Sequence, residues 1–469
     1  MKSIITFCIA ALFSCAAYSD TIILKNGDRI HADSAHESNG RVEYTVGDNT
    51  LTIPKSIVVR IEKGPIVTAS PASSVPSGAI DPPPPHEEMA ASGDLVARVI
   101  RNGVIDAAAI KDIESENIPE QSASANSIAA NFEEKRNNYG AAARYLQAAL
   151  VFLPGHGVLL ENFTAVLLKL GNNDEALLRA QQAAHASPQS ADAFLLLGFA
   201  YYKTDHNHEA IAALKKALQL RPDARTQQLL DKVERESRTE ADFRQQESSH
   251  FTLRYEGSQA SDILRTQVLD LLEADYRELS VDLGAAPKNI YVSLYTDQAF
   301  FDVTHAAAWT SALNDGKIRI PISGVKSVTP EMASVLKHEL AHSFIAQITH
   351  NRTPSWLNEG IAQVEQGMTT VAIGQRLASL YDSGRQVPLN QLESEFQGYS
   401  TAEASVAYAE SLAAVEYIRA TYGMSDLARL LQRLGDGQGI ESALRSTIHG
   451  GYAELEAEIT GYLKKNYGA

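Results

Sequence analysis

The spacing of apolar residues changes along the chain, and each change marks a different kind of structure. Over residues 20–63, apolar and polar residues alternate in short runs, as in VEYTV at 42–46, which is typical of half-buried β-strands. Asn26-Gly27 between two of these runs is a common hairpin turn. This region therefore predicts a small all-β module, a small barrel or open sheet.

In the next region the apolar residues recur with a longer period. Residues 93–246 carry helical spacing, and within 123–224 the same residue types return every 34 positions. The recurring residues include Ala142, Ala176 and Ala210, and Pro154, Pro188 and Pro222. This pattern resembles that of tetratricopeptide repeats, in which small residues let paired helices pack closely. The resemblance implies an α-solenoid, either a rigid spacer or a surface that binds a protein partner, with residues 93–122 as capping helices.

Residues 247–469 place strands first and helices afterwards. Three alternating runs predict strands: 250–255, 290–294 and 317–322. An amphipathic stretch at 259–283 predicts a long helix, and nearly everything after residue 328 has helical spacing. This order predicts an α+β domain, so the expected fold class is multidomain: a β module, an α-solenoid and an α+β domain.

Two segments lie outside these three regions. Residues 64–92 are rich in Pro, Ser and Ala and include four consecutive prolines, which predicts a semi-extended spacer. Residues 1–19 have the plan of a secretory signal peptide, with Lys2, an apolar run and small residues before Asp20. We therefore expect export, to the bacterial periplasm or cell envelope.

Both cysteines, Cys8 and Cys15, lie within this leader, so its removal leaves no thiol in the mature chain. An alternative is that LFSC at 12–15, which loosely resembles a lipobox, directs lipidation of Cys15 and membrane anchoring. No later segment approaches 18 uninterrupted apolar residues, so the mature chain is expected to have no transmembrane helix.

Composition and net charge indicate which kinds of binding partner are unfavourable. The chain has 44% hydrophobic and 21% charged residues, which is typical of globular proteins. Its formal net charge of −16 disfavours nucleic acid and anionic membrane surfaces as partners.

The candidate chemistry begins with HELAH, which contains His338, Glu339 and His342. Residues four apart lie one turn apart on one face of a helix, so both imidazoles can reach one zinc ion at about 2.0–2.1 Å. Glu339 then sits beside the ion, where it can take a proton from attacking water and pass it to a leaving amine. Apolar flanking residues predict a buried helix, in which polar side chains need a purpose.

Catalytic zinc commonly takes three protein ligands, so a third is needed. The metzincin arrangement is excluded, because Ile345 and Ile348 stand where it requires Gly and His. His350 is at no recognised ligand spacing and is interpreted as a loop or helix-end histidine. Glu359 is the better candidate, since a new helix is expected to begin near Ser355 and a glycine follows Glu359.

HELAH followed by WLNEGIA resembles the gluzincin metallopeptidases, the thermolysin and aminopeptidase-N-like superfamily, and in particular the bacterial peptidase-MA-like domains that often carry tetratricopeptide repeats. The resemblance covers residues 247–469. It implies that His338, His342 and Glu359 bind Zn²⁺ and that Glu339 is the general base. Sixteen residues separate His342 from Glu359, fewer than in the thermolysin or aminopeptidase-N-like groups, which indicates a compact branch.

The same resemblance implies further positions. Tyr408 in AYAESL corresponds to a tyrosine that donates to the oxyanion of the tetrahedral intermediate, the alternative being an ordinary core tyrosine. Residues 316–322 correspond to an edge strand that binds an extended peptide. The position that orients a ligand imidazole is occupied by Gln363, with Glu365 and Glu410 as other candidates.

These observations predict an exported zinc-dependent peptidase. The main alternative is a non-catalytic envelope scaffold, in which the repeats and a vestigial metallopeptidase domain bind partners. The β module resembles small SH3-like domains at the start of bacterial envelope proteins, which suits either reading. A third hypothesis is zinc-dependent hydrolysis of a non-peptide amide, such as one in cell-wall material.

Overall fold

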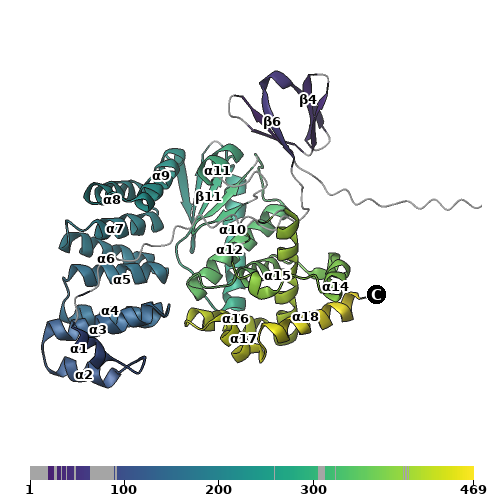
Figure 1. Ribbon diagram of the computed structural model, residues 1–469. Helices are drawn as coiled ribbons and strands as arrows, with labels where there is room; N and C mark the ends of the chain where they lie inside the picture. The colour runs from purple at the N-terminus through teal and green to yellow at the C-terminus, as the bar shows by residue number, and fades with distance from the viewer. Residues whose placement is uncertain are drawn as a thin grey trace, which may run out of the picture. The chain divides into compact units, whose positions relative to one another are not determined.

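The computed structural model describes most of the chain after residue 19 (Figure 1). The described residues are 20–25, 29–32, 34–38, 40–46, 49–63, 89, 92–257, 259–304, 312–322, 324–394, 396, 399 and 401–468. They fall into two compact units, the β module up to Lys63 and the remainder from Met89 onward. The expected signal peptide, both cysteines and most of the expected spacer lie outside the described residues.

The N-terminal β module contains, within its described residues, six strands in two three-stranded antiparallel sheets. The strands are β1 (Asp20–Leu24), β2 (Arg29–Ala32), β3 (Ser34–Ser38), β4 (Arg41–Val46), β5 (Asn49–Pro54) and β6 (Val58–Lys63). Ile22, Val42 and Val58 are buried between them, as the alternation of apolar residues predicts. β3 was not predicted, because its sequence SAHES holds only one apolar residue.

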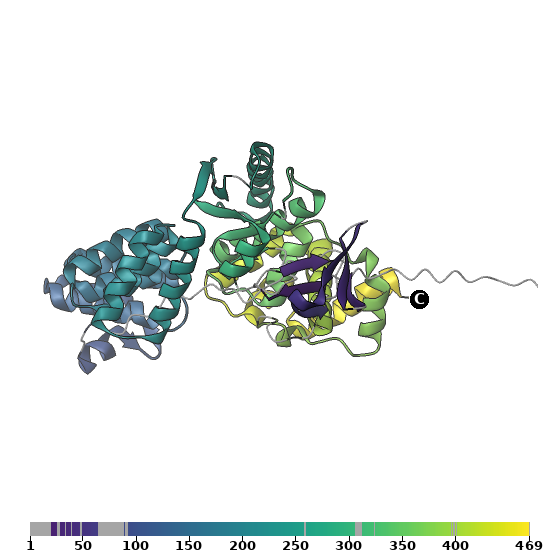
Figure 2. The ribbon, with the colours of Figure 1, turned by 90° about the horizontal axis from the view of Figure 1, so that it is seen from above.

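The α-solenoid confirms the 34-residue period (Figures 1 and 2). Its helices are α3 (Pro119–Glu134), α4 (Tyr139–Phe152), α5 (Gly157–Lys169), α6 (Asn173–Ala186), α7 (Ala191–Lys203), α8 (Asn207–Leu220) and α9 (Ala224–Thr239). Ala142, Ala176 and Ala210 are fully buried between paired helices. The cap consists of α1 (Gly93–Val99) and α2 (Ala107–Ser115), joined by the short hairpin β7 (Ile100–Arg101) and β8 (Val104–Ile105).

A mixed sheet opens the C-terminal domain, with the strand order β12-β13-β11-β10-β9 among the described residues. The strands are β9 (Phe243–Glu247), β10 (Phe251–Glu256), β11 (Ile290–Tyr295), β12 (Leu313–Asn314) and β13 (Ile318–Pro321). The three central strands are parallel, and both outer strands run antiparallel to their neighbours.

The structure corrects the prediction that residues 316–322 form the edge strand. β13 pairs with β11 on one side and with β12 on the other, so β12 is the edge. A two-residue strand is too short to show an alternation of apolar and polar residues, so β12 could not be predicted from the sequence. β9 begins at Phe243, four residues before the expected start of the domain, because RQQE lacks an apolar pattern.

Helices pack on this sheet and on one another, and together they complete one hydrophobic core. They are α10 (Asp262–Leu283), α11 (Asp297–Thr304), α12 (Pro330–Thr349), α13 (Ser355–Glu365), α14 (Gly374–Asp382), α15 (Thr401–Tyr422), α16 (Met424–Gly435), α17 (Ile440–Ile448) and α18 (Tyr452–Tyr467), with short 3₁₀ turns at Thr370–Ala372 and Leu389–Gln391. Within the described part of the chain, no helix combines the length and apolar character that crossing a membrane requires.

Buried charges join the solenoid to the sheet. The junction cluster, as we name it, consists of Asp205, Lys232, Glu236, Glu240, Arg254, Asp315, Lys317 and Arg319. At its centre the Arg319 side chain, 1% exposed, lies 3.0 Å from Glu236 and 3.2 Å from Asp315. The cluster holds four basic and four acidic groups, so the buried charges are balanced.

The turns inside the three repeats make a second set of contacts with the C-terminal domain. Asn137, Gly171 and Asp205 are 34 residues apart, and each has a left-handed backbone, with φ of 58°, 73° and 63°. Contacts at or beside these turns are Arg352 donating to the Asn137 carbonyl, Asn289 donating to Asp174 at 3.0 Å, and Arg254 donating to Asp205 at 2.9 Å. The solenoid is therefore attached along a row of equivalent turns.

Candidate metal centre

Helix α12 carries the HExxH residues, as predicted. Thr329 caps its first turn by accepting from the Met332 amide at 3.2 Å, and Pro330 occupies the first turn. The helix ends at Thr349, and His350 follows as its C-cap in a left-handed conformation. His350 is therefore a helix-end histidine, one of the two interpretations that the sequence offered. His338 and His342 lie one turn apart with ring centroids 4.7 Å apart and planes nearly perpendicular.

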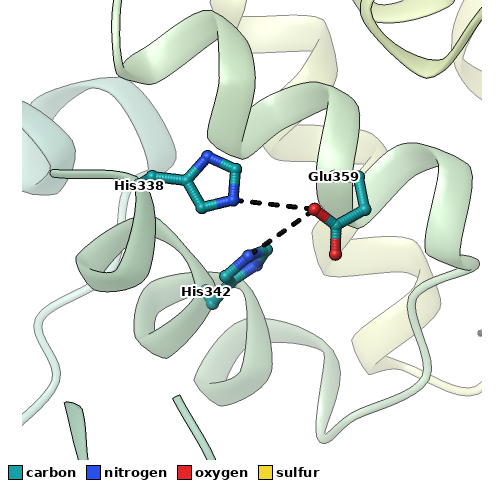
Figure 3. Close-up of side chains that lie close together, drawn as sticks. All are labelled: His338, His342 and Glu359. Atoms are coloured by element: carbon teal, nitrogen blue, oxygen red, sulfur yellow. Dashed lines mark ion pairs between the residues drawn. The ribbon is translucent and has the colours of Figure 1, made fainter. Parts of the chain in front are cut away.

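Helix α13 brings Glu359 to the two imidazoles (Figure 3). Its Oε2 lies 3.6 Å from His338 Nε2 and 3.8 Å from His342 Nε2. One ligand atom from each of the three residues lies within 4.8 Å of the others. Two ligands on a tetrahedral zinc with bonds of about 2.05 Å are about 3.3 Å apart, so the observed spacing is close to that of a zinc site.

The position of α13 follows from its packing. Trp356 is fully buried, and its indole N–H donates to the Tyr452 hydroxyl at 3.3 Å. A side chain at Gly360 would overlap the Ser411 carbonyl of α15. The glycine after Glu359 therefore allows a close approach of two helices, and this approach fixes the ligand helix.

Polar atoms that lack hydrogen bonds support a cation at this point. His338 Nε2 and Glu339 Oε1 are buried, and neither has a hydrogen-bond partner among the described residues. Leaving such atoms buried and unbonded costs free energy that a bound ion would offset. The donor set of two imidazoles and a carboxylate is also that of catalytic zinc, so the residues fit the metal.

Burial dominates the electrostatics of the site. It lowers the pKa of His338 to about 4, against the opposing effect of the hydrogen bond with Gln366, and it also lowers the pKa of His342. Burial, and then the charge of Glu359, raise the pKa of Glu339 well above its usual value. Both imidazoles are therefore neutral near pH 7, which is the form that binds a metal.

The groups that orient the imidazoles differ from those predicted. His338 Nδ1 donates to Gln366 Oε1, whose own amide nitrogen donates to Ser334 at 3.2 Å. His342 Nδ1 donates to Asn358 Oδ1 at 3.1 Å. These bonds place the proton on Nδ1 and leave Nε2 of each ring free to bind a metal.

The predicted orienting residues lie elsewhere in the hydrogen-bond network. Gln363 is buried, and its Oε1 has no hydrogen-bond partner within the described chain. Glu410 accepts from the Val387 amide at 3.1 Å, and burial raises the pKa of Glu410 and of Glu365 to about 7. Gln366 is the C-cap of α13 and lies seven residues, about two turns, after Glu359. This spacing is compatible with a place near the ligands but does not by itself identify the partner of His338.

Replacing Gln366 with leucine is expected to weaken zinc binding by about 10–100-fold, because the His338 ring loses the acceptor that fixes its tautomer and orientation. Competition with a chromophoric chelator measures the zinc dissociation constant. The control is Gln347→Leu, which changes an exposed glutamine on α12. Equal zinc affinity in the two variants would show that Gln366 does not support the ligand.

Tyr408 lies on α15, the helix that packs against α13. The residue is 6% exposed, and its ring packs edge to face on Phe396 with centroids 5.4 Å apart. Ser411, nearly one turn later, lies against Gly360. This geometry places Tyr408 on a helix beside the ligand helix, whereas its catalytic role stays a prediction.

Comparisons with known proteins identify two regions of the chain, the C-terminal domain and the repeats. The family model described as Peptidase MA superfamily matches residues 277–465, and a tetratricopeptide repeat model matches residues 167–233. No curated protein matches the chain. A solved structure, MamA 41-end from Desulfovibrio magneticus RS-1, is 26% identical over 28% of this chain and 75% of that chain, with a TM-score of 0.25 that supports no structural argument. The chain therefore contains a Peptidase MA superfamily domain preceded by tetratricopeptide repeats.

Proposed function

We propose that the protein is a zinc-dependent peptidase. The observation that carries this proposal is the convergence of His338, His342 and Glu359 around one point, with the Glu339 carboxyl buried on the same helix turn. A site that only stabilises the fold is usually closed by four protein ligands and needs no additional carboxyl group. Three ligands and one spare carboxyl group favour catalysis.

Each residue of the site has a separate role in the proposed hydrolysis. His338, His342 and Glu359 would hold a zinc ion, which would supply a Lewis acid for the attacking water and the scissile carbonyl. Glu339 takes the proton of the attacking water and delivers it to the leaving amine. Asn358 and Gln366 hold the ligand imidazoles in the required tautomer. The His342 side chain, 15% exposed, marks the side of the site that is nearest to solvent.

The substrate we propose is a peptide in extended form. Among the described strands, β12 and β9 are the two edges of the sheet, and the Asn314 side chain of β12 contacts α12. An extended chain can add to such an edge through backbone hydrogen bonds. This assignment replaces β13, the edge expected from the sequence.

Tyr408→Phe is expected to lower kcat by about 10–10³-fold and leave zinc content unchanged, because the role we propose for the phenol hydroxyl is to donate to developing negative charge. Initial rates at saturating substrate measure the effect. Tyr422→Phe, near the end of the same helix, is the control, since its hydroxyl makes a long hydrogen bond of 3.4 Å to Glu458. Full activity of the Tyr408 variant would assign this residue to the core alone.

The direct test combines metal analysis with product sequencing. Purified protein is expected to contain one zinc per chain and to cleave members of a broad peptide library, with both properties lost in Glu359→Ala. Protein that folds but binds no zinc would contradict the proposal. We further propose export to the bacterial periplasm or cell envelope, which sequencing of the mature N-terminus tests directly.

The repeats support a second role, binding of a protein partner on the solenoid. In a scaffold of this kind the peptide library would stay intact although the chain is folded. Zinc-loaded protein that cleaves no peptide would favour this role.

A further inference from the structure

The side chain of Asn314 in β12 forms hydrogen bonds with α12, the helix that carries Glu339. Asn314 Nδ2 donates to the Glu339 backbone carbonyl and to Ser343 Oγ, both at 2.7 Å. Its Oδ1 accepts from the Gly316 amide at 3.0 Å. Because the oxygen is engaged by an N–H group, the amide nitrogen is the end that faces α12. Asn314 therefore fixes β12 to the residue whose carboxyl is the proposed general base.

The next residue is held by the solenoid. Asp315 is 3% exposed and lies 2.8 Å from Lys232 of α9 and 3.2 Å from Arg319 of β13. Burial alone would raise the pKa of Asp315, but the charges of Arg319 and Lys232 outweigh it and hold the pKa well below its usual range. Asp315 is therefore ionised at neutral pH. It forms ion pairs both with the solenoid, through Lys232, and with the sheet, through Arg319.

Asn314 and Asp315 thus form a two-residue bridge. On one side it reaches α12 at Glu339, and on the other it reaches α9, the last helix of the solenoid. The bridge is short, and both of its side chains have their polar atoms engaged. A displacement of α9 relative to the sheet would move Asp315 and, through it, the donor on the Glu339 carbonyl.

We propose that Asn314 is a positioning residue for Glu339, and that α9 of the solenoid sets its place through the Lys232–Asp315 ion pair. This inference rests on the proposed peptidase function. A general base acts only within hydrogen-bond reach of its proton, and a displacement of about 1 Å can cost about 100-fold in rate. The repeat region is accordingly part of the catalytic architecture.

The first experiment removes the donor. Asn314→Leu keeps the approximate volume and has no polar atom, whereas Asn314→Asp keeps the acceptor for Gly316 but has no proton for the Glu339 carbonyl. Both are expected to lower kcat by about 10–100-fold with KM within about 2-fold of the wild type. Zinc affinity is expected to be unchanged, because neither variant touches a ligand.

The second experiment changes Lys232, the residue of the solenoid that pairs with Asp315. Lys232→Met keeps the length of the side chain and removes its charge, and it is expected to lower kcat in the same way by about 3–30-fold. Lys232→Arg restores the cation and is expected to recover most of the rate. The matched control is Lys215→Met, which removes an exposed ion pair of 2.8 Å between Lys215 of α8 and Glu234 of α9.

Two readouts separate positioning from general damage. Thermal unfolding monitored by circular dichroism confirms that each variant is folded, and the visible spectrum of cobalt-loaded protein reports the metal environment without turnover. We expect a wild-type cobalt spectrum in every variant and a clearly lowered kcat only in Asn314→Leu, Asn314→Asp and Lys232→Met.

The outcomes distinguish this inference from the proposed function. Wild-type protein that binds no zinc or cleaves no peptide removes the proposed function. Active wild-type protein with an unchanged kcat in Asn314→Asp and Asn314→Leu overturns the positioning role alone. A fall in kcat that is as large in Lys215→Met as in Lys232→Met would show a general effect of the solenoid and would overturn the bridge.

Discussion

Glu339→Gln is expected to lower kcat for peptide cleavage by about 10²–10⁴-fold while the protein retains its zinc. Glutamine has nearly the same shape as glutamate, but it cannot accept the proton of the attacking water. The three ligand side chains are untouched, and the replaced carboxyl is not one of the converging ligand groups. The loss should therefore appear in turnover and not in metal content.

Steady-state kinetics on a cleaved library peptide, with zinc determined by atomic absorption, provides the measurement. Glu331→Gln is the control, because Glu331 is exposed in the first turn of the same helix. Activity within threefold of the wild type in the Glu339 variant would require another proton acceptor and would remove Glu339 from the mechanism.

Arg319→Met is expected to lower the free energy of unfolding by about 3–5 kcal/mol, because it leaves several buried acidic groups without their central partner. Arg319 lies 3.0 Å from Glu236 and 3.2 Å from Asp315, and it also donates to the Tyr295 hydroxyl at 2.8 Å. Methionine fills much of the volume, so the loss comes from the charge and its hydrogen bonds.

Urea unfolding followed by circular dichroism measures this loss. Arg429→Met is the matched control, since Arg429 is 61% exposed and pairs with Asp426 at the surface, where such a pair contributes about 0–1 kcal/mol. A loss below 1 kcal/mol in Arg319→Met would mean that the junction cluster contributes little to the stability of the fold.

The candidate site was predictable because its information is local. His338 and His342 are four residues apart on one helix, and Glu359 is marked by the proline that starts the next helix and the glycine that follows it. The orienting role of Gln366 depends on how α12 and α13 pack together, and this contact cannot be derived from spacing alone.

The junction cluster shows why the remaining features were missed. The alternation around β13, in which Lys317 and Arg319 alternate with Ile318 and Ile320, is typical of a strand with one face in solvent. In the structure that face is covered by the solenoid, and Glu236 supplies the compensating charge from a position 83 residues earlier. Pattern rules describe one element at a time, so they cannot identify charges that are neutralised across two domains.

The row of turns at Asn137, Gly171 and Asp205 limits how the repeat region can change in length. Arrays of this kind commonly gain or lose whole units by duplication, since each unit contacts only its neighbours. Here each unit also touches a different, non-repeating part of the C-terminal domain. Duplication of an internal unit would move one end of the array away from its partner, so natural variation in this chain should occur by substitution within the three units.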